Sequence, residues 1–174
     1  ACVAHEWGHW YVATKTEYGH TATALVERWR WLRTIGDLAH AEPTATRAVA
    51  LARQFHAVDE GWARFIGQRL VNRLLDQYPL FADGLAAAAA PDEDDALLQK
   101  LTASLPPAGS PWSEAERRAL LAAAAETDAG RSLLAQAAFV RLAARRGLAT
   151  CLGALSSMHK WASPLEDLLT LVAQ

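Results

Sequence analysis

The residue pattern along this chain is typical of helices and lacks the features that would build a sheet. Alternation of β-branched or aromatic residues with polar ones, the usual mark of a strand, is missing from the 174 residues. Glycine and proline instead fall where helices of ordinary length would end. Much of the 52% hydrophobic content is alanine, which favours helix but buries little surface, so larger apolar residues must form the core. The sequence predicts an all-α, multi-helix domain.

Helix-ending and helix-starting residues divide the chain into predicted helices. In the first half we expect helices over about 2–17, 21–41, 44–58 and 59–77, with Pro43 separating the second from the third. In the second half we expect helices over 115–127, 129–146 and 148–159, and a last one beginning at Pro164. Two pairs have the spacing of a capping box at a helix start: Ser113 with Glu116, and Ser163 with Glu166.

Composition suggests three parts. Residues 1–80 carry the zinc-binding motif described below, and residues 108–174 form a C-terminal helical part. Between them, residues 81–107 are rich in alanine and then acidic, and we expect two short helices there. The proline-rich stretch 105–111 (LPPAGSP) is the clearest linker.

The charge balance argues against nucleic-acid or membrane partners. The net charge is −2, and no apolar run is long enough to cross a bilayer. The segment Glu27–Arg33 interleaves arginine with tryptophan, which suits either single-stranded nucleic acid or a packed helix face, and the overall charge favours packing. No secretory signal is visible, and two cysteines, Cys2 and Cys151, fit a reducing compartment, so we expect a cytoplasmic protein.

The most specific feature is His5-Glu6-Trp7-Gly8-His9, which has the spacing HExxH. On a helix, residues i and i+4 share a face, so His5 and His9 can present imidazole nitrogens to one metal ion. Glu6 lies beside them and can act as a general base on a zinc-bound water without binding the metal itself. The motif predicts a Zn²⁺ site with Glu6 as the catalytic residue.

The other residues of this helix predict how it packs. Val3, Trp7 and Trp10 follow helical spacing, and we expect their face to be buried. Gly8 costs about 1 kcal/mol relative to alanine inside a helix, which indicates that another element approaches closely there.

A catalytic zinc site needs a third protein ligand, which would come from further along the chain. The metzincin pattern would need glycine at position 12 and histidine at 15, where this chain has Val12 and Lys15. The segment 58–65 (VDEGWARF) instead resembles the gluzincin (thermolysin-like) metallopeptidases, in which a second helix supplies a glutamate in a similar context. The resemblance covers about residues 2–66 and implies that His5, His9 and Glu60 bind zinc. Asp59 and His56 are the nearest rivals to Glu60.

The chain also departs from this family. Gluzincins carry a small β-sheet before the HExxH helix, and its edge strand binds the substrate backbone. We expect an N-terminal segment or a partner chain to supply that strand here. The family's aspartate four residues after the zinc-binding glutamate is replaced by Arg64, and Asp59 is the candidate for its role.

Several further residues are candidates near the site. An oxyanion-stabilising or proton-donating role is open to four side chains, although residues of these types are more often packed or solvated: Tyr11, Tyr18, His20 and His56. Cys2 precedes His5 by three residues and is either near the metal or a small core residue.

Two functions follow as expectations. The first is zinc-dependent hydrolysis of peptide bonds in a peptide or protein substrate. The alternative is a non-catalytic interaction or regulatory module whose zinc is structural or whose peptidase site is degenerate. An open fourth coordination position favours the first, and a closed one, for example through Cys2, favours the second.

Overall fold

The computed structural model describes residues 2–78, 93–107, 110, 112–127 and 129–174, except for the side chain of Cys2. Throughout these residues every regular element is a helix, which confirms the all-α prediction. The α-helices are α1 (Cys2–Lys15), α2 (Glu17–Thr34), α3 (Leu38–Gln77), α5 (Glu93–Ser104), α6 (Glu114–Ala124), α7 (Gly130–Arg146), α8 (Leu148–Ser157) and α9 (Pro164–Ala173). None of them is long and apolar enough to cross a membrane.

The first two helices meet earlier than expected. We predicted that the first would run to about residue 17 and the second would begin near 21, but α1 ends at Lys15 and α2 begins at Glu17. Thr16 explains the difference, because its hydroxyl accepts a hydrogen bond from the Gly19 amide at 3.0 Å and caps α2. The same hydroxyl donates to the Val12 carbonyl at 2.6 Å, so one buried side chain closes α1 and opens α2.

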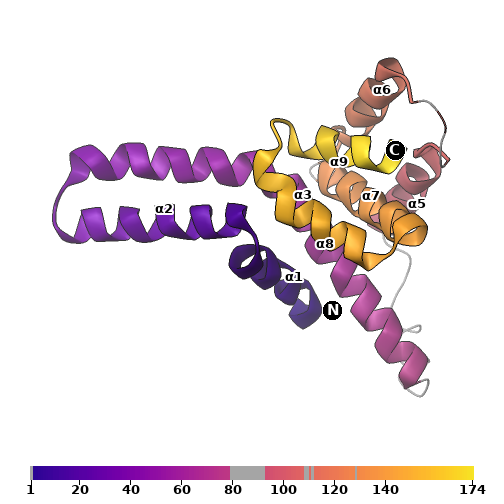
Figure 1. The fold of residues 1–174 in the computed structure, drawn as a ribbon, viewed down its shortest axis with the longest axis horizontal. Helices are drawn as coiled ribbons and strands as arrows, with labels where there is room; N and C mark the ends of the chain where they lie inside the picture. The colour runs from indigo at the N-terminus through magenta and orange to yellow at the C-terminus, as the bar shows by residue number, and fades with distance from the viewer. Residues whose placement is uncertain (1, 79–92, 108–109, 111, 128) are drawn as a thin grey trace.

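Helix α3 is continuous over 40 residues, so the predicted breaks at Pro43 and between residues 58 and 59 are both wrong. Pro43 is the sixth residue of the helix, so the lost backbone donor leaves only the carbonyl four residues earlier without its partner. Contacts between α2 and α3 also hold this end in place, and Ala41 is buried there. The two helices form an antiparallel hairpin that extends away from the remaining helices (Figure 1).

The core is centred on α7, which contacts α3, α5, α6, α8 and α9. All residues from Leu133 to Phe139 are buried in this helix. Phe139 packs against Trp62 and Phe65 of α3, with ring centroids 5.4 and 6.0 Å away. Side chains from both the motif-bearing and the C-terminal parts thus belong to one hydrophobic cluster.

Helix α1 packs on the middle of α3 through small residues. A Cβ atom at Gly8 would lie 2.5 Å from the Cα of Ala63, and one at Gly67 would lie 3.2 Å from the backbone nitrogen of His5. The close approach predicted from Gly8 is confirmed. The expectation that Val3, Trp7 and Trp10 are buried is wrong, since they are 86%, 42% and 51% exposed. The glycine face of α1, not the tryptophan face, meets α3 because only it allows the two backbones to approach.

The two predicted capping boxes have different outcomes. Ser113 and Glu116 form a complete box at the start of α6. At the start of α9, Pro164 occupies the first turn as predicted, but Ser163 makes no side-chain cap with Glu166. The Ser163 amide donates to Asp167 at 3.0 Å instead, so a carboxylate one residue later takes that role. Of the two short helices expected in 81–107, α5 is present, and residues 81–92 lie outside the described part of the chain.

Candidate metal centre

Three predicted ligands converge at the crossing of α1 and α3. The Nε2 atoms of His5 and His9 are 3.1 Å apart. Glu60 places Oε1 3.5 Å from the His5 Nε2 and Oε2 3.3 Å from the His9 Nε2. These three residues form a group of half-buried side chains whose ligand atoms could hold one metal ion.

The spacing of these atoms can be compared with zinc geometry. In a tetrahedral zinc site with bonds of about 2.0–2.1 Å, neighbouring ligand atoms lie about 3.3–3.4 Å apart. The histidine nitrogens are 3.1 Å apart, while the 3.5 and 3.3 Å separations involve different oxygens of Glu60. With one ligand atom taken from each residue, the three atoms lie within 4.8 Å of one another. Two imidazole nitrogens and one carboxylate oxygen are also a common zinc donor set. The residues present therefore fit a zinc ion in their chemistry, and they lie close enough together to hold one ion.

Helix geometry places these side chains, although not in the way that we predicted for Glu60. His5 and His9 share one face of α1 because they are four residues apart. We expected Glu60 at a helix start, oriented by free backbone amides. It lies instead in the middle of the continuous α3, so those amides are already hydrogen-bonded within the helix. Gly61 permits close approach as expected, but of α7, since a Cβ there would lie 2.5 Å from the Cβ of Ala135.

Asp59 orients His9 from the side opposite the cluster. Its Oδ1 lies 3.1 Å from the His9 Nδ1. When the Asp59 carboxylate accepts a hydrogen bond from Nδ1–H, the neutral imidazole keeps its lone pair on Nε2, which faces His5 and Glu60. Burial raises the pKa of Asp59, against the opposing effect of the hydrogen bond from His9. Asp59 thus contacts a predicted ligand rather than taking the place of Glu60.

Arg64 holds Glu60 in a way that the sequence-based interpretation missed. Its Nε donates to Glu60 Oε1 at 3.1 Å, and its Nη1 donates to Asp94 Oδ2 of α5 at 3.0 Å. The first contact follows from the i, i+4 spacing of Glu60 and Arg64 on one helix, a signal present in the sequence. The second joins residues 30 apart along the chain, and no local pattern predicts it.

Glu6 lies in the same pocket as the cluster. A cavity of about 580 Å³ is lined by His5 and Glu6 of α1, by Glu60 and Arg64 of α3, and by residues of α5 and α7. Glu6 is exposed, and it makes no hydrogen bond or ion pair with any other described residue. The position predicted for a general base therefore has a carboxylate that is open to a substrate or to water.

The remaining candidates lie around the site without entering the ligand group. Tyr11 packs on Trp62 with ring centroids 5.9 Å apart, and the His20 Nε2 lies 2.9 Å from the Thr14 carbonyl oxygen. Tyr18 is buried against Phe55, and burial together with the Asp59 charge raises its pKa to about 12.

His56 lines a different pocket, but its charge acts on Asp59, whose pKa it lowers. The side chain of Cys2 lies outside the described residues. None of these positions replaces Glu60 in the described ligand group.

Comparisons with protein-family models, with characterised proteins and with solved structures find no match to this chain. The gluzincin resemblance therefore depends on the motif residues and on the geometry above.

Proposed function

We propose that this chain binds one zinc ion through His5, His9 and Glu60 and hydrolyses peptide bonds. The observation that carries the proposal is the convergence of two imidazoles and a carboxylate, with ligand atoms within 4.8 Å of one another, from segments 51 residues apart. Glu6 and two of these ligands, His5 and Glu60, line one cavity. Local helix geometry accounts for the histidine pair alone. Only the packing of α1 on α3 adds Glu60.

Each side chain has a distinct task in this proposal. A zinc ion held by the three ligands would act as a Lewis acid and bring the pKa of a bound water toward about 7. Glu6 accepts a proton from the attacking water and returns it to the departing amine. Asp59 keeps the His9 ring in the orientation and tautomer that presents Nε2. Arg64 fixes one oxygen of Glu60 and joins it to α5.

The substrate would enter the cavity between α1, α3 and α5. That cavity is lined by apolar side chains next to the polar ones, including Val71, Leu98 and Leu133. A backbone-binding strand is missing from the described residues. We propose that an N-terminal segment or a partner chain supplies this strand next to α1, where Trp7 and Trp10 are exposed.

The missing strand also favours a second candidate function. A helical module that keeps the zinc ligands but cannot hold an extended peptide would act in binding or regulation, with zinc as a structural element. The two functions share the ligand set and differ in whether Glu6 takes part in a reaction.

The Glu6→Gln variant tests the first function against the second. The amide keeps the shape of the side chain but cannot accept a proton, so zinc content should stay at one per chain while cleavage of a quenched fluorescent peptide library falls at least a hundredfold. Glu27→Gln, which makes the same change on the exposed surface of α2, is the matched control and should cleave like the parent. Equal activity of Glu6→Gln and parent contradicts the role of Glu6. Zinc binding without cleavage by the parent chain supports the second function.

A further inference from the structure

The cavity at the metal centre is the first of three adjacent cavities. A middle cavity of about 550 Å³ shares Gln68 and Leu98 with it. An end cavity of about 690 Å³ shares Gln68, Val140 and Ala144 with the middle cavity. Cavities that share lining side chains are neighbours, so the three form a row that begins at the metal centre.

Helix α7 forms a wall common to the three cavities. Leu133 and Gln136 line the cavity at the metal centre, and Val140 and Ala144 line both of the others. These residues are three or four positions apart, so they lie on one face of α7. From the first to the last the helix rises about 16 Å, which an extended peptide covers with about five residues. The row is therefore long enough for an extended peptide.

The exposed surface of the middle cavity is mainly apolar. Leu98 and Ala103 of α5 contribute to it, together with Val140 and Ala144 of α7. The guanidinium group of Arg141 also lies there, but it donates a hydrogen bond to a backbone carbonyl of α5 at 2.8 Å. An apolar side chain of a peptide would be removed from water in this cavity, which favours its binding.

A pair of amide side chains lies where the cavities meet. Gln68 lines all three cavities, and it accepts a hydrogen bond at 3.0 Å from Gln136, which lines the cavity at the metal centre. Each amide group has both donor and acceptor atoms, so it can also bond to a peptide N–H or C=O. The two glutamines thus offer hydrogen bonds to the backbone of a peptide beside the apolar surface.

The end cavity is cationic. Arg69 and Arg73 lie one turn apart on α3 and line it, and Asp76 is the one acidic residue among its lining residues. Both arginines are exposed, and neither forms an ion pair with any residue that the structure describes. Guanidinium groups bind carboxylates through charge-assisted hydrogen bonds, so two of them without a carboxylate partner favour an anionic group.

The cavity at the metal centre has the opposite charge. Glu6, Asp94 and Asp95 line it in addition to Glu60. Its one arginine, Arg64, is already paired with Glu60 and Asp94. A carboxylate of a substrate would be repelled by these acidic groups and attracted to the end cavity. The two ends of the row therefore differ in the charge that they accept.

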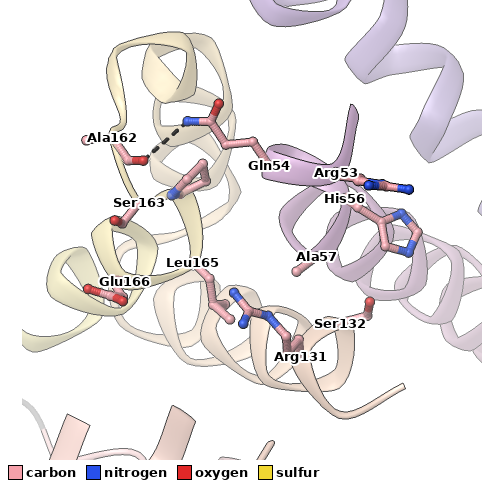
Figure 2. Close-up of a pocket in the computed structure, with 11 residues that line it drawn as sticks. Arg53, Gln54, His56, Ala57, Arg131, Ser132, Ala162, Ser163, Leu165 and Glu166 are labelled. Carbon is pink, nitrogen blue, oxygen red and sulfur yellow. Dashed lines mark hydrogen bonds between the residues drawn. The ribbon is translucent and has the colours of Figure 1, made fainter. Parts of the chain in front are cut away.

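The pocket drawn in Figure 2 does not belong to this row. It has a volume of about 370 Å³ and lies between α3, α7 and the start of α9. Gln54 closes one side of it by donating a hydrogen bond to the Ala162 carbonyl at 3.2 Å. None of its lining residues lines any of the three cavities. The row instead follows α3 and α7 toward their C-terminal ends.

We propose that the substrate is a peptide that lies along this row, with an apolar side chain in the middle cavity and a carboxylate bound by Arg69 and Arg73. This proposal rests on the peptidase function proposed above. The two arginines follow Glu60 by nine and thirteen residues on α3, which corresponds to about 14–20 Å. An extended peptide spans that distance with about four to six residues. The carboxylate belongs either to an acidic side chain or to the C-terminus of the peptide.

Cleavage of designed peptides tests this proposal. Quenched fluorescent peptides of about ten alanine, leucine and serine residues, with both ends blocked, carry Glu, Gln or Lys near one end or the other. We expect kcat/KM for the better Glu peptide to exceed that of its Gln counterpart at least tenfold, with Lys poorer still. Mass spectrometry should find the cleaved bond about four to six residues from Glu. A Gln peptide with a free C-terminal carboxylate distinguishes a chain end from a side chain as the bound group.

Arg69→Gln and Arg73→Gln test the end cavity. Each should reduce the preference for the carboxylate peptide over the blocked Gln peptide about threefold or more, and the double variant should abolish it. Arg47→Gln, an exposed arginine near the other end of α3, is the matched control and should keep the preference of the parent. Equal cleavage of all the peptides by the parent contradicts the proposal, and so does a preference that survives in the double variant.

A binding measurement separates this proposal from the peptidase function. Fluorescence anisotropy of labelled peptides with the zinc-loaded Glu6→Gln chain reports binding without cleavage. Tighter binding of the carboxylate peptide, lost when Arg69 and Arg73 are also replaced, supports the peptide site. If the parent chain then cleaves nothing, the peptidase function alone is contradicted. Cleavage without any preference for a carboxylate, or binding without one, contradicts the peptide site proposed here.

Discussion

Replacing Gly8 by alanine should loosen the contact between α1 and α3 on which the proposed metal centre depends. The new Cβ would lie 2.5 Å from the Cα of Ala63, 2.9 Å from a methyl group of Ile66 and 3.0 Å from the Ala63 Cβ. A backbone atom cannot rotate away, so α1 must move outward by about 1 Å to restore ordinary contacts of about 3.5–4.0 Å. That shift would carry His5 and His9 away from Glu60.

The expected cost follows from two opposing effects. Alanine gains about 0.5–1 kcal/mol over glycine inside a helix, while overpacking typically costs about 1–3 kcal/mol and can cost more against backbone. We therefore expect a net loss of about 1–2 kcal/mol in the free energy of unfolding, measured by urea denaturation. We also expect at least a tenfold loss of zinc affinity, because the spacing of the ligand atoms changes.

Gly153→Ala is the matched control. Gly153 lies inside α8, and a Cβ there meets no atom within 4 Å, so this variant should gain about 0.5–1 kcal/mol and leave zinc affinity unchanged. If Gly8→Ala proved as stable as Gly153→Ala and bound zinc like the parent, the close packing of α1 on α3 would not be what positions the ligands.

Three further predictions follow from individual contacts. Asp59→Ala removes the hydrogen bond to His9 and should weaken zinc binding about 10–100-fold in a competition assay with a chelator. Unchanged zinc affinity in this variant would contradict the role of Asp59 in orienting His9. Tyr18 has a pKa raised from 10.0 to about 12, so the folded state keeps its proton while the unfolded state loses it. This difference contributes about 2–3 kcal/mol to the free energy of unfolding, which is present below pH 10 and lost as the pH rises to 12. In Tyr18→Phe, the free energy of unfolding should therefore fall by that much less between pH 10 and 12. Phe139→Ala should cost about 3–5 kcal/mol of unfolding free energy by urea denaturation, because its ring is fully buried between Trp62 and Phe65, and a loss below 1 kcal/mol would contradict the placement of the core.

The sequence predicted the helical fold because local patterns determine it. Helix-forming residues, terminal glycines and prolines, and the Ser113–Glu116 box act over a few residues, and these features lie close to where they were expected. Pro43 misled the prediction because its local cost is small near a helix start, and packing of α3 against α2 outweighs it. A separate predicted boundary, between residues 58 and 59, is also wrong because α3 is continuous there, and it had placed Glu60 at a helix start instead of mid-helix.

The residues of the candidate metal centre were predictable from the sequence, but the contacts that support them were not. His5, His9 and Glu60 were selected from motif spacing and resemblance, and the structure brings them together. Which face of α1 packs inward was not evident from hydrophobicity, since Trp7 and Trp10 are more apolar than Gly8 yet remain exposed. The link from Arg64 to Asp94 depends on how α5 docks, which is set by tertiary contacts that no local pattern encodes.

The central claim is that His5, His9 and Glu60 hold one zinc ion. X-ray absorption spectroscopy of the chain loaded with one equivalent of zinc tests it most directly, when combined with the Glu60→Gln variant. For the parent chain we predict two imidazole nitrogens at about 2.0–2.1 Å from the zinc ion and a carboxylate oxygen at about 2.0–2.2 Å. The Glu60→Gln variant should lose the carboxylate contribution to the spectrum and at least tenfold in zinc affinity. A spectrum that is the same in parent and Glu60→Gln, or one dominated by sulfur at about 2.3 Å, would contradict the assignment of Glu60 as the third ligand.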